Sequence, residues 1–280
     1  PYVRGKVTSK KIDDILFEAE QLVSNGYKEI VLTGIHLGAY GKETGYQLNI
    51  INVLEELQAL PGLERIRLSS IEVNEVTDDL IDLIADSDRV CPHFHLPLQS
   101  GDDYILKRMN RKYDAAQYLE TVERIRGRLE LPSISTDILV GFPGEKRIHF
   151  ENTMKLCEQA GFSRAHIFSY SPREDTPAAK MPDHCKPSDI KERKKELEFL
   201  TAETSLEYKN LFVGRDIGIL VEKERDKKTG KLCGYSDRYI KALFDGPDDL
   251  MNEIADVHVE SVSPQSVMGK CCSHAERGNK

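Results

Sequence analysis

Short apolar runs alternate with amphipathic segments over the first 170 residues of the chain. Each apolar run has the length and composition of a buried strand. These runs lie at residues 29–33, 65–69, 93–98, 135–140 and 164–168. Between them, apolar residues recur at helical spacing, as at Ile50, Val53, Leu54 and Leu57. Strands that alternate with helices predict a parallel sheet with right-handed connections, and no G-x-G-x-x-G motif follows the first strand. We therefore expect an α/β fold, an open or partial (β/α) barrel, rather than a dinucleotide-binding fold.

Polar residues that precede the amphipathic segments predict where helices begin. Ser9, Asn49 and Thr77 each precede such a segment and have side chains that accept hydrogen bonds from a first helical turn. Further helices are expected at residues 102–109, 115–128 and 150–160. At the start of the last one, Lys146 and Arg147 place cations against the helix dipole, which costs about 0.3–1 kcal/mol each.

The pattern changes after residue 170. A polar loop precedes a charged helix at residues 187–208, and short strands follow at 217–221, 239–244 and 254–262. Turn-rich, charged segments separate these strands, which predicts a small antiparallel β-barrel. The residues from 269 onward show no periodicity and are expected to be disordered. We expect domains at residues 1–208 and 209–270, followed by a tail at 271–280.

Composition limits the classes of protein that fit this pattern. Of 280 residues, 39% are hydrophobic, and the longest apolar runs are too short to span a membrane. The formal net charge of −8 gives no general sign of nucleic-acid binding, so any such surface must be local. Six cysteines without a C-x-x-C pair indicate neither a zinc site nor a disulfide framework, and a reducing cytoplasm is expected. The sequence begins with Pro1 instead of an initiator methionine, and no signal-peptide pattern follows. We therefore expect the chain to be a piece of a longer protein.

Small polar residues end several of the predicted strands. They are Thr33-Gly34, Ser69-Ser70, Gln99-Ser100 and Gly141. The carboxyl ends of parallel strands carry the chemistry in folds of this kind. Together these residues suit a ligand with many hydroxyl groups lying across the strand ends.

Two other patterns have both a functional and an ordinary structural interpretation. His93 and His95 lie on one face of a strand, as in metal-dependent barrel hydrolases, or they are hydrogen-bonded core residues. In the β domain, cations are interleaved with Tyr235 and Tyr239, which suits RNA, although nearby acidic residues also fit an ordinary solvated surface. These cations are Lys223, Arg225, Lys227, Lys228, Lys231, Arg238 and Lys241.

The ordered motifs along the chain resemble those of the radical S-adenosylmethionine (SAM) methylthiotransferases. The matching segments are PYVRG (1–5), LTGIHLGAYG (32–41), RLSSIE (67–72), HLPLQSGDD (95–103), LKRMNR (106–111), TDILVGFPGE (136–145), YSPR (170–173) and TPAA (176–179). The resemblance covers about residues 1–270, and the β domain resembles the TRAM RNA-binding module of that family.

This resemblance implies cofactors and partners. It implies that SAM binds at Thr33, Gly34, Ser69, Ser70, Gln99, Ser100 and Gly141, and that Arg111 pairs with its carboxylate. It implies tRNA binding through Lys223, Arg238, Tyr239 and Lys241, and an electron donor. The family uses two [4Fe-4S] clusters, and its C-x-x-x-C-x-x-C motif would precede Pro1. We therefore expect this chain to ligate no cluster, to contain no certain catalytic residue and to be inactive alone.

The family divides by substrate. One branch modifies isopentenyladenosine in tRNA, one modifies threonylcarbamoyladenosine in tRNA, and one modifies an aspartate of a ribosomal protein. The segments GIH (34–36), LQSGDD (98–103) and GYSDRY (234–239) most resemble the threonylcarbamoyladenosine branch. The isopentenyladenosine branch, a non-enzymatic RNA-binding remnant and a metal-dependent hydrolase remain the alternatives.

Overall fold

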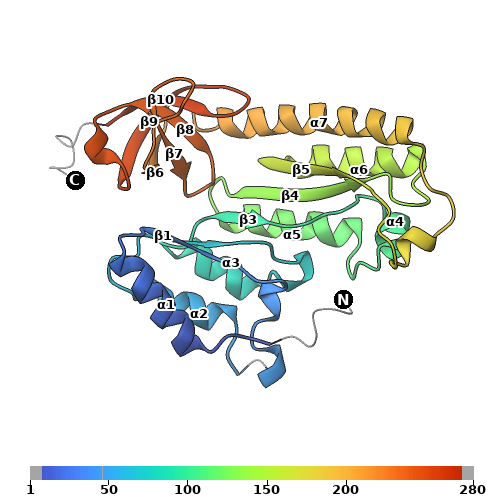
Figure 1. Cartoon of the computed structure of the whole chain (residues 1–280), viewed down its shortest axis with the longest axis horizontal. Coiled ribbons are helices and arrows are strands. Elements are labelled where there is room, and N and C mark those ends of the chain that lie inside the picture. Colours follow the sequence, from blue (N-terminus) through green and yellow to red (C-terminus); the bar gives the residue numbers. More distant parts are fainter. Residues whose placement is uncertain (1–7, 46, 273–280) are drawn as a thin grey trace. The chain divides into compact units, whose positions relative to one another are not determined.

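The structure is a computed structural model, and it describes residues 8–45 and 47–272. The described residues form two compact units. The first contains residues 8–71 apart from 46, together with 77–93 and 209–272, and the second contains 72–76 and 94–208. Figure 1 labels the elements along the chain.

The first unit contains a small α/β layer. Its elements are α1 (Ile12–Ser24), β1 (Glu29–Leu32), η1 (Leu37–Ala39), η2 (Lys42–Thr44), α2 (Ile50–Gln58), β2 (Arg65–Leu68) and α3 (Asp78–Ala85). Strands β1 and β2 are parallel, with Ile30 opposite Ile66. Asn49 and Thr77 cap α2 and α3 as predicted. The prediction for Ser9 is wrong, because α1 begins after Lys11 and the Ser9 hydroxyl instead donates to Glu43 Oε2 at 3.0 Å.

The first unit also contains a closed five-stranded barrel. Its strands are β6 (Asp216–Val221), β7 (Leu232–Ser236), β8 (Lys241–Asp245), β9 (Ile254–Val262) and β10 (Val267–Cys271), with η5 (Asp248–Leu250) between β8 and β9. All pairings in the barrel are antiparallel except that of β8 with β10, which is parallel. Alternate residues of β9, including Val257 and Val259, are fully buried inside it.

Two features of the barrel differ from the sequence prediction. Strand β7 was not expected, because Gly234 weakens the strand pattern of a five-residue segment. Strand β10 continues to Cys271, so the expectation of disorder from residue 269 is wrong for residues 269–271, which pair with β9. The Cys272 amide also donates to Asp256 O at 2.9 Å, and residues 273–280 of the expected tail lie outside the described residues.

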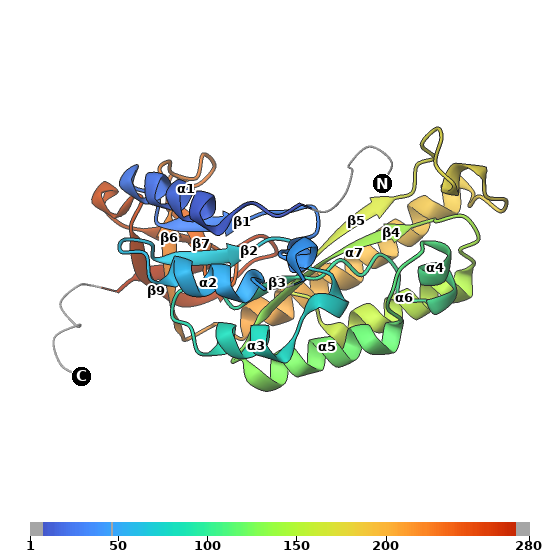
Figure 2. The same cartoon turned by 90° about the horizontal axis from the view of Figure 1, so that it is seen from below.

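The second unit contains most of the second sheet and four helices. Its elements are η3 (Val73–Glu75), β3 (His93–His95), α4 (Asp103–Arg108), α5 (Ala115–Arg128), β4 (Ser133–Val140), α6 (Arg147–Ala160), β5 (Arg164–Ser169), η4 (Ala178–Lys180) and α7 (Pro187–Asn210). His93 of β3 and the last two residues of α7 belong to the first unit. The strand order is β3-β4-β5, and β4 and β5 are parallel (Figure 2).

Helices cover one face of this sheet. Ile134, Thr136 and Ile138 of β4 are fully buried on that face, and the Tyr118 hydroxyl of α5 donates to Leu96 O at 2.8 Å. The predicted fold class, a partial (β/α) barrel of the α/β class followed by a small β-barrel, is confirmed, although the β-barrel includes one parallel pairing. The domain boundaries at 208 and 270 stay a prediction.

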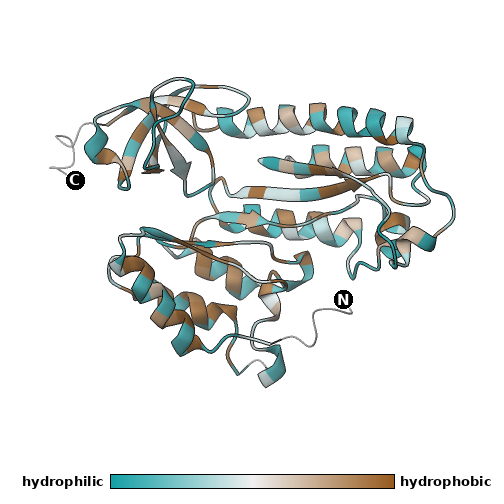
Figure 3. Ribbon diagram, viewed as in Figure 1, coloured by the Kyte–Doolittle hydropathy of each residue, from teal (hydrophilic) through white to brown (hydrophobic). Residues whose placement is uncertain are grey.

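The longest helix of the described residues, α7, is mainly polar. Figure 3 shows hydrophilic residues recurring along α7. Among the residues that the structure describes, no helix is long and apolar enough to cross a membrane.

Candidate functional site

The ends of β1 and β2 bring predicted site residues to one edge of the first unit's sheet. Thr33 and Gly34 follow β1 and are exposed, and Ser69 and Ser70 follow β2. The Ser69 amide donates to Leu32 O at 3.0 Å, so the two strands remain paired up to this edge. The hydroxyls of Thr33, Ser69 and Ser70 therefore lie at the ends of neighbouring strands, and their role in cofactor binding stays a prediction.

A cavity of about 500 Å³ adjoins the end of β1. Thr33, Gly34 and His36 line one part of it, and apolar residues of α1 and α2 line much of the rest. Its lining area is mainly apolar, which favours an organic group over a hydrated ion.

Gln99 has the strongest structural signature among the predicted residues of the second unit. Its backbone has φ of 63°, a conformation that is unfavourable for a residue other than glycine. Its amide nitrogen donates to Asp137 O at 2.8 Å and its carbonyl accepts from Leu139 N at 2.9 Å, so β4 fixes the residue on both sides. Its half-exposed side-chain amide makes no hydrogen bond within the described residues. Backbone strain of this kind is typical of ligand-binding positions.

Ser100 and Gly141 lie inside the second unit instead of on its surface. The Ser100 hydroxyl is 3.3 Å from Thr153 Oγ1 and accepts from the Asp102 amide, so its side chain supports the next turn. Gly141 is buried, and its amide donates to Glu145 Oε1 at 3.1 Å. The Ser100 side chain therefore points inward, and its predicted role in cofactor binding stays a prediction.

Arg111 is half-buried and forms an ion pair within the second unit. Its Nη1 atom donates to Glu72 Oε1 at 2.9 Å. This contact uses one of the five guanidinium donors, so the contact does not conflict with a second carboxylate partner.

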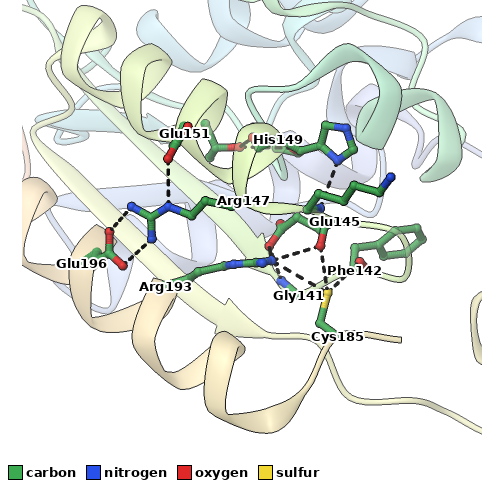
Figure 4. Close-up of polar contacts among 12 residues, drawn as sticks. Gly141, Phe142, Glu145, Arg147, His149, Glu151, Cys185, Arg193 and Glu196 are labelled. Carbon is green, nitrogen blue, oxygen red and sulfur yellow. Dashed lines mark hydrogen bonds and ion pairs between the residues drawn. The ribbon is translucent and has the colours of Figure 1, made fainter. Parts of the chain in front are cut away.

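The turn between β4 and α6 contains a buried ion pair (Figure 4). Arg193 Nη1 of α7 donates to Glu145 Oε1 at 2.7 Å and to Glu145 O at 3.1 Å. Burial raises the pKa of the Glu145 carboxyl, and Arg193 opposes that shift. The Cys185 thiol donates to Glu145 O at 3.2 Å, and burial raises the pKa of Cys185, so this thiol is not an activated nucleophile.

Local contacts offset the cations at the start of α6. Arg147 donates to both carboxylate oxygens of Glu196 at 2.6 and 2.8 Å and to Glu151 at 2.9 Å, and these contacts raise the pKa of Arg147. His149 Nδ1 accepts from the Lys146 amide at 3.1 Å and thereby satisfies one donor at the helix start (Figure 4).

The two histidines of β3 have ordinary packing partners. His95 Nδ1 is 3.0 Å from Ser135 Oγ, and His95 Nε2 is 3.4 Å from Asp137 Oδ2. The ring of buried His93 lies 5.4 Å from that of Tyr239. Within residues 8–45 and 47–272, no group of three or more His, Cys, Asp or Glu side chains is placed to hold a metal ion. The hydrolase alternative therefore has no ligand set in the described chain.

The predicted RNA-binding residues of the barrel make contacts within the first unit. Lys241 Nζ lies 3.1 Å from Asp226 Oδ2, which lowers the pKa of Asp226 to about 2, and Arg238 Nη1 lies 2.7 Å from Asp237 Oδ2. Lys223 lies over the ring of Tyr27 at 5.5 Å. Tyr239 is partly exposed and stacks on Tyr235, with ring centroids 5.1 Å apart.

Sequence reasoning missed the two buried arginines of β2. Arg67 is 2% exposed, pairs with Glu29 at 2.7 Å, and donates to Asp237 O and Ser236 O of the β7–β8 turn. Its guanidinium also lies 4.7 Å from the centre of the Tyr239 ring. Arg65 donates to Gly218 O and Tyr235 O. The sequence did contain a sign of these buried arginines, because Arg alternates with Ile and Leu in a strand that was expected to be buried on both faces.

The cysteines do not form a cluster site. All six are free, and Cys91 and Cys157 are fully buried, with burial raising the pKa of Cys91 to about 12. Since an iron–sulfur cluster takes several thiolates, the described residues do not fit one. Within the first unit, the strand-end hydroxyls suit the hydroxyl groups of a ligand, and within the second unit Arg111 suits a carboxylate.

Parallel β/α units with polar residues at their carboxyl ends place the chain in the class of (β/α) folds, and comparison with known proteins identifies the family. Residues 1–157 match the model of the radical SAM superfamily. The chain belongs to this superfamily. The fold is similar to that of coproporphyrinogen III oxidase HemN from Escherichia coli, a radical SAM enzyme, with a TM-score of 0.52 and 15% identity over 71% of this chain and 48% of that chain.

Two curated relatives match nearly the whole chain. Threonylcarbamoyladenosine tRNA methylthiotransferase MtaB of Thermotoga maritima is 39% identical over 94% of this chain and 59% of that protein. The tRNA-2-methylthio-N(6)-dimethylallyladenosine synthase of Alkaliphilus oremlandii is 36% identical over 96% of this chain and 57% of that protein. The chain thus spans less than two thirds of the length of these relatives.

Proposed function

We propose that this chain is the catalytic-core and barrel part of a tRNA methylthiotransferase that modifies N6-threonylcarbamoyladenosine next to the anticodon. The observation that carries the proposal is the 39% identity to a relative of that name across nearly the whole chain. Membership of the radical SAM superfamily and the closed barrel that follows the β/α layer support it.

The superfamily implies SAM and a [4Fe-4S] cluster, which supply the radical that removes hydrogen from a substrate. In the proposed enzyme, the two clusters are ligated by residues other than those described. The described residues contribute binding and orientation. Thr33, Ser69 and Ser70 offer hydroxyls to the cofactor, Gln99 offers its unbonded side-chain amide, and Arg111 offers its remaining donors to a carboxylate. Gly34, Ser100 and Gly141 shape the strand ends through their backbone.

The proposed tRNA surface is the part of the barrel around the Tyr235–Tyr239 stack. Exposed Tyr239 suits base stacking, while Lys223, Arg238 and Lys241 suit phosphates. Replacing these three cations together should weaken tRNA binding and flatten its dependence on salt. Unchanged affinity and an unchanged salt slope would contradict the assignment of this surface.

The alternative candidate substrate is the dimethylallyl (isopentenyl) form of adenosine in tRNA. The 36% identity to synthases that act on this nucleoside supports it, and so does the mainly apolar cavity beside β1. A threonylcarbamoyl group carries a carboxylate and requires a cation or several donors, whereas an isopentenyl group requires an apolar pocket.

Deletion of the gene that encodes the full-length protein tests the proposal. Mass spectrometry of nucleosides from bulk tRNA should show loss of the 2-methylthio form of threonylcarbamoyladenosine, with its precursor accumulating, and a plasmid copy should restore it. Loss of the methylthio-isopentenyl product alone would establish the second substrate. If both products persist, a non-enzymatic role in RNA binding becomes the better interpretation.

A further inference from the structure

The turn that joins β4 to α6, residues 141–145, is held by contacts rather than by its own sequence preferences alone. Gly141 has φ of 82° and Gly144 has φ of 89°, and all five residues are buried. A Cβ atom at Gly141 would lie 2.4 Å from Ile190 Cγ1 of α7, so the helix packs directly on the strand end. Two glycines with left-handed backbones give a turn many alternative conformations, and only surrounding contacts select one.

Glu145 makes the contact that closes this turn. Its Oε1 atom accepts from the Gly141 amide at 3.1 Å, four residues earlier in the chain. The same oxygen accepts from Arg193 Nη1 at 2.7 Å, and Arg193 also donates to the Glu145 carbonyl at 3.1 Å. The side chains of Arg193 and Glu145 are 9% and 3% exposed. Arg193 therefore pairs, inside the protein, with the carboxylate that fixes the Gly141 amide.

A second arginine holds the other side of the same turn. Arg108 Nε of α4 donates to Pro143 O at 3.0 Å, and its guanidinium is the group nearest to Gly144. The turn is thus contacted from α4 and from α7. A buried ion pair adds little net stability compared with apolar side chains of the same size, so its value here is the geometry that it imposes.

We propose that Arg193 is a positioning residue for the cofactor: acting through Glu145, it fixes the carboxyl end of β4 in the conformation that the cofactor requires. The inference rests on the proposed role of Gly141 at the cofactor-binding strand ends. Arg193 itself does not contact the cofactor in this assignment. Its effect reaches the ligand through the Glu145 carboxylate and the Gly141 backbone.

Hydrogen–deuterium exchange of the full 280-residue chain tests the positioning step without any cofactor. In Arg193→Met, the Gly141 amide should exchange about tenfold faster or more, because its acceptor is no longer fixed. Arg147→Met is the matched control, since it also removes an Arg–Glu pair between the α6 segment and α7 but leaves the turn untouched. The control should exchange like the wild type in residues 141–145. Wild-type protection of Gly141 in Arg193→Met would overturn the inference.

The affinity of the cluster-loaded, full-length protein for SAM tests the link to the cofactor. Arg193→Met should weaken SAM binding about tenfold, as expected when a binding segment is displaced, while Arg147→Met should not. Should Arg193→Met fail to fold, Arg193→Lys and Glu145→Gln replace it, and both should show faster Gly141 exchange and weaker SAM binding. Faster Gly141 exchange with unchanged SAM affinity would overturn the inference, because it would show that the conformation of this turn does not affect cofactor binding. Neither outcome depends on the tRNA nucleoside analysis, so a wrong substrate is distinguishable from a wrong positioning residue.

Discussion

Replacing Arg193 by Met should destabilise the protein far more than replacing Arg147 by Met. The Arg193–Glu145 pair is almost fully buried, and loss of one partner leaves the other as an uncompensated buried charge. Such a change costs about 3–5 kcal/mol in unfolding free energy. Arg147 also pairs with a glutamate of α7, but its side chain is 52% exposed, so solvent screening limits its cost to about 0–1 kcal/mol.

The pH dependence gives this prediction a second, independent signature. Burial already raises the pKa of Glu145, and Arg193 is the main group that opposes the shift, so its loss should raise that pKa further. A carboxyl with a raised folded-state pKa contributes stability that is present below its unfolded value of about 4.3 and lost as pH rises through the folded value. The destabilisation by Arg193→Met should therefore be smaller at acidic pH than at pH 8.

Urea unfolding followed by circular dichroism at both pH values measures these effects. The double variant Glu145→Gln with Arg193→Met should recover part of the lost stability, because it removes the unpaired charge. A loss no larger than that of Arg147→Met, or a loss that is the same at both pH values, would refute the reasoning that the pair is buried and coupled.

Three further substitutions test individual contacts through urea melts. Arg67→Met should cost about 3–5 kcal/mol because it removes the shorter of the two arginine contacts of partly buried Glu29, leaving Arg65 at 3.9 Å, and frees the β7–β8 turn; a loss below about 1 kcal/mol would show that these contacts are not made in solution. Gly141→Ala should cost about 2–4 kcal/mol, since its φ is 82° and its new Cβ meets Ile190; wild-type stability would contradict this packing. Tyr118→Phe should cost only about 1 kcal/mol, because Thr136 continues to donate to the same carbonyl, Leu96 O; a loss above about 3 kcal/mol would contradict that compensation.

The β/α part of the fold was predictable because its signals are local. Apolar runs and helical spacing mark the strands and helices, and Asn49 and Thr77 cap the helices that they precede. The prediction that Ser9 caps α1 failed because a capping residue must directly precede the first helical residue, and Ser9 is three residues before Ile12. Strand β7 was missed because Gly234 weakens its local pattern, and β10 was missed because the closure of the barrel, which a local pattern does not show, provides its partners.

The sequence predicted which candidate residues follow strands, but not how their side chains are oriented. Thr33 follows β1 and Ser69 follows β2, yet sequence spacing does not show where a side chain points once the chain leaves the strand. Gln99 stays half-exposed with a strained backbone, whereas the next residue, Ser100, turns inward to Thr153. The Glu145–Arg193 pair was invisible for a related reason, because its members are 48 residues apart and only the packing of α7 joins them.

The basic residues of the barrel surface have acidic partners that a count of charges in the sequence does not show. Lys241 and Arg238 each lie beside an aspartate, so the cluster that looks basic in sequence is largely neutralised in the structure. Partly exposed ion pairs of this kind contribute about 0–1 kcal/mol to the free energy of unfolding. RNA phosphates could therefore replace the aspartates as partners of these cations at little cost. Each replacement would, however, leave an unpaired aspartate beside the RNA. The Tyr235–Tyr239 stack is different, since buried Arg67 already holds Tyr239 in place. A tRNA bound here would therefore gain more from stacking on a preformed aromatic surface than from new ion pairs, and its salt dependence should be shallower than the number of basic residues implies.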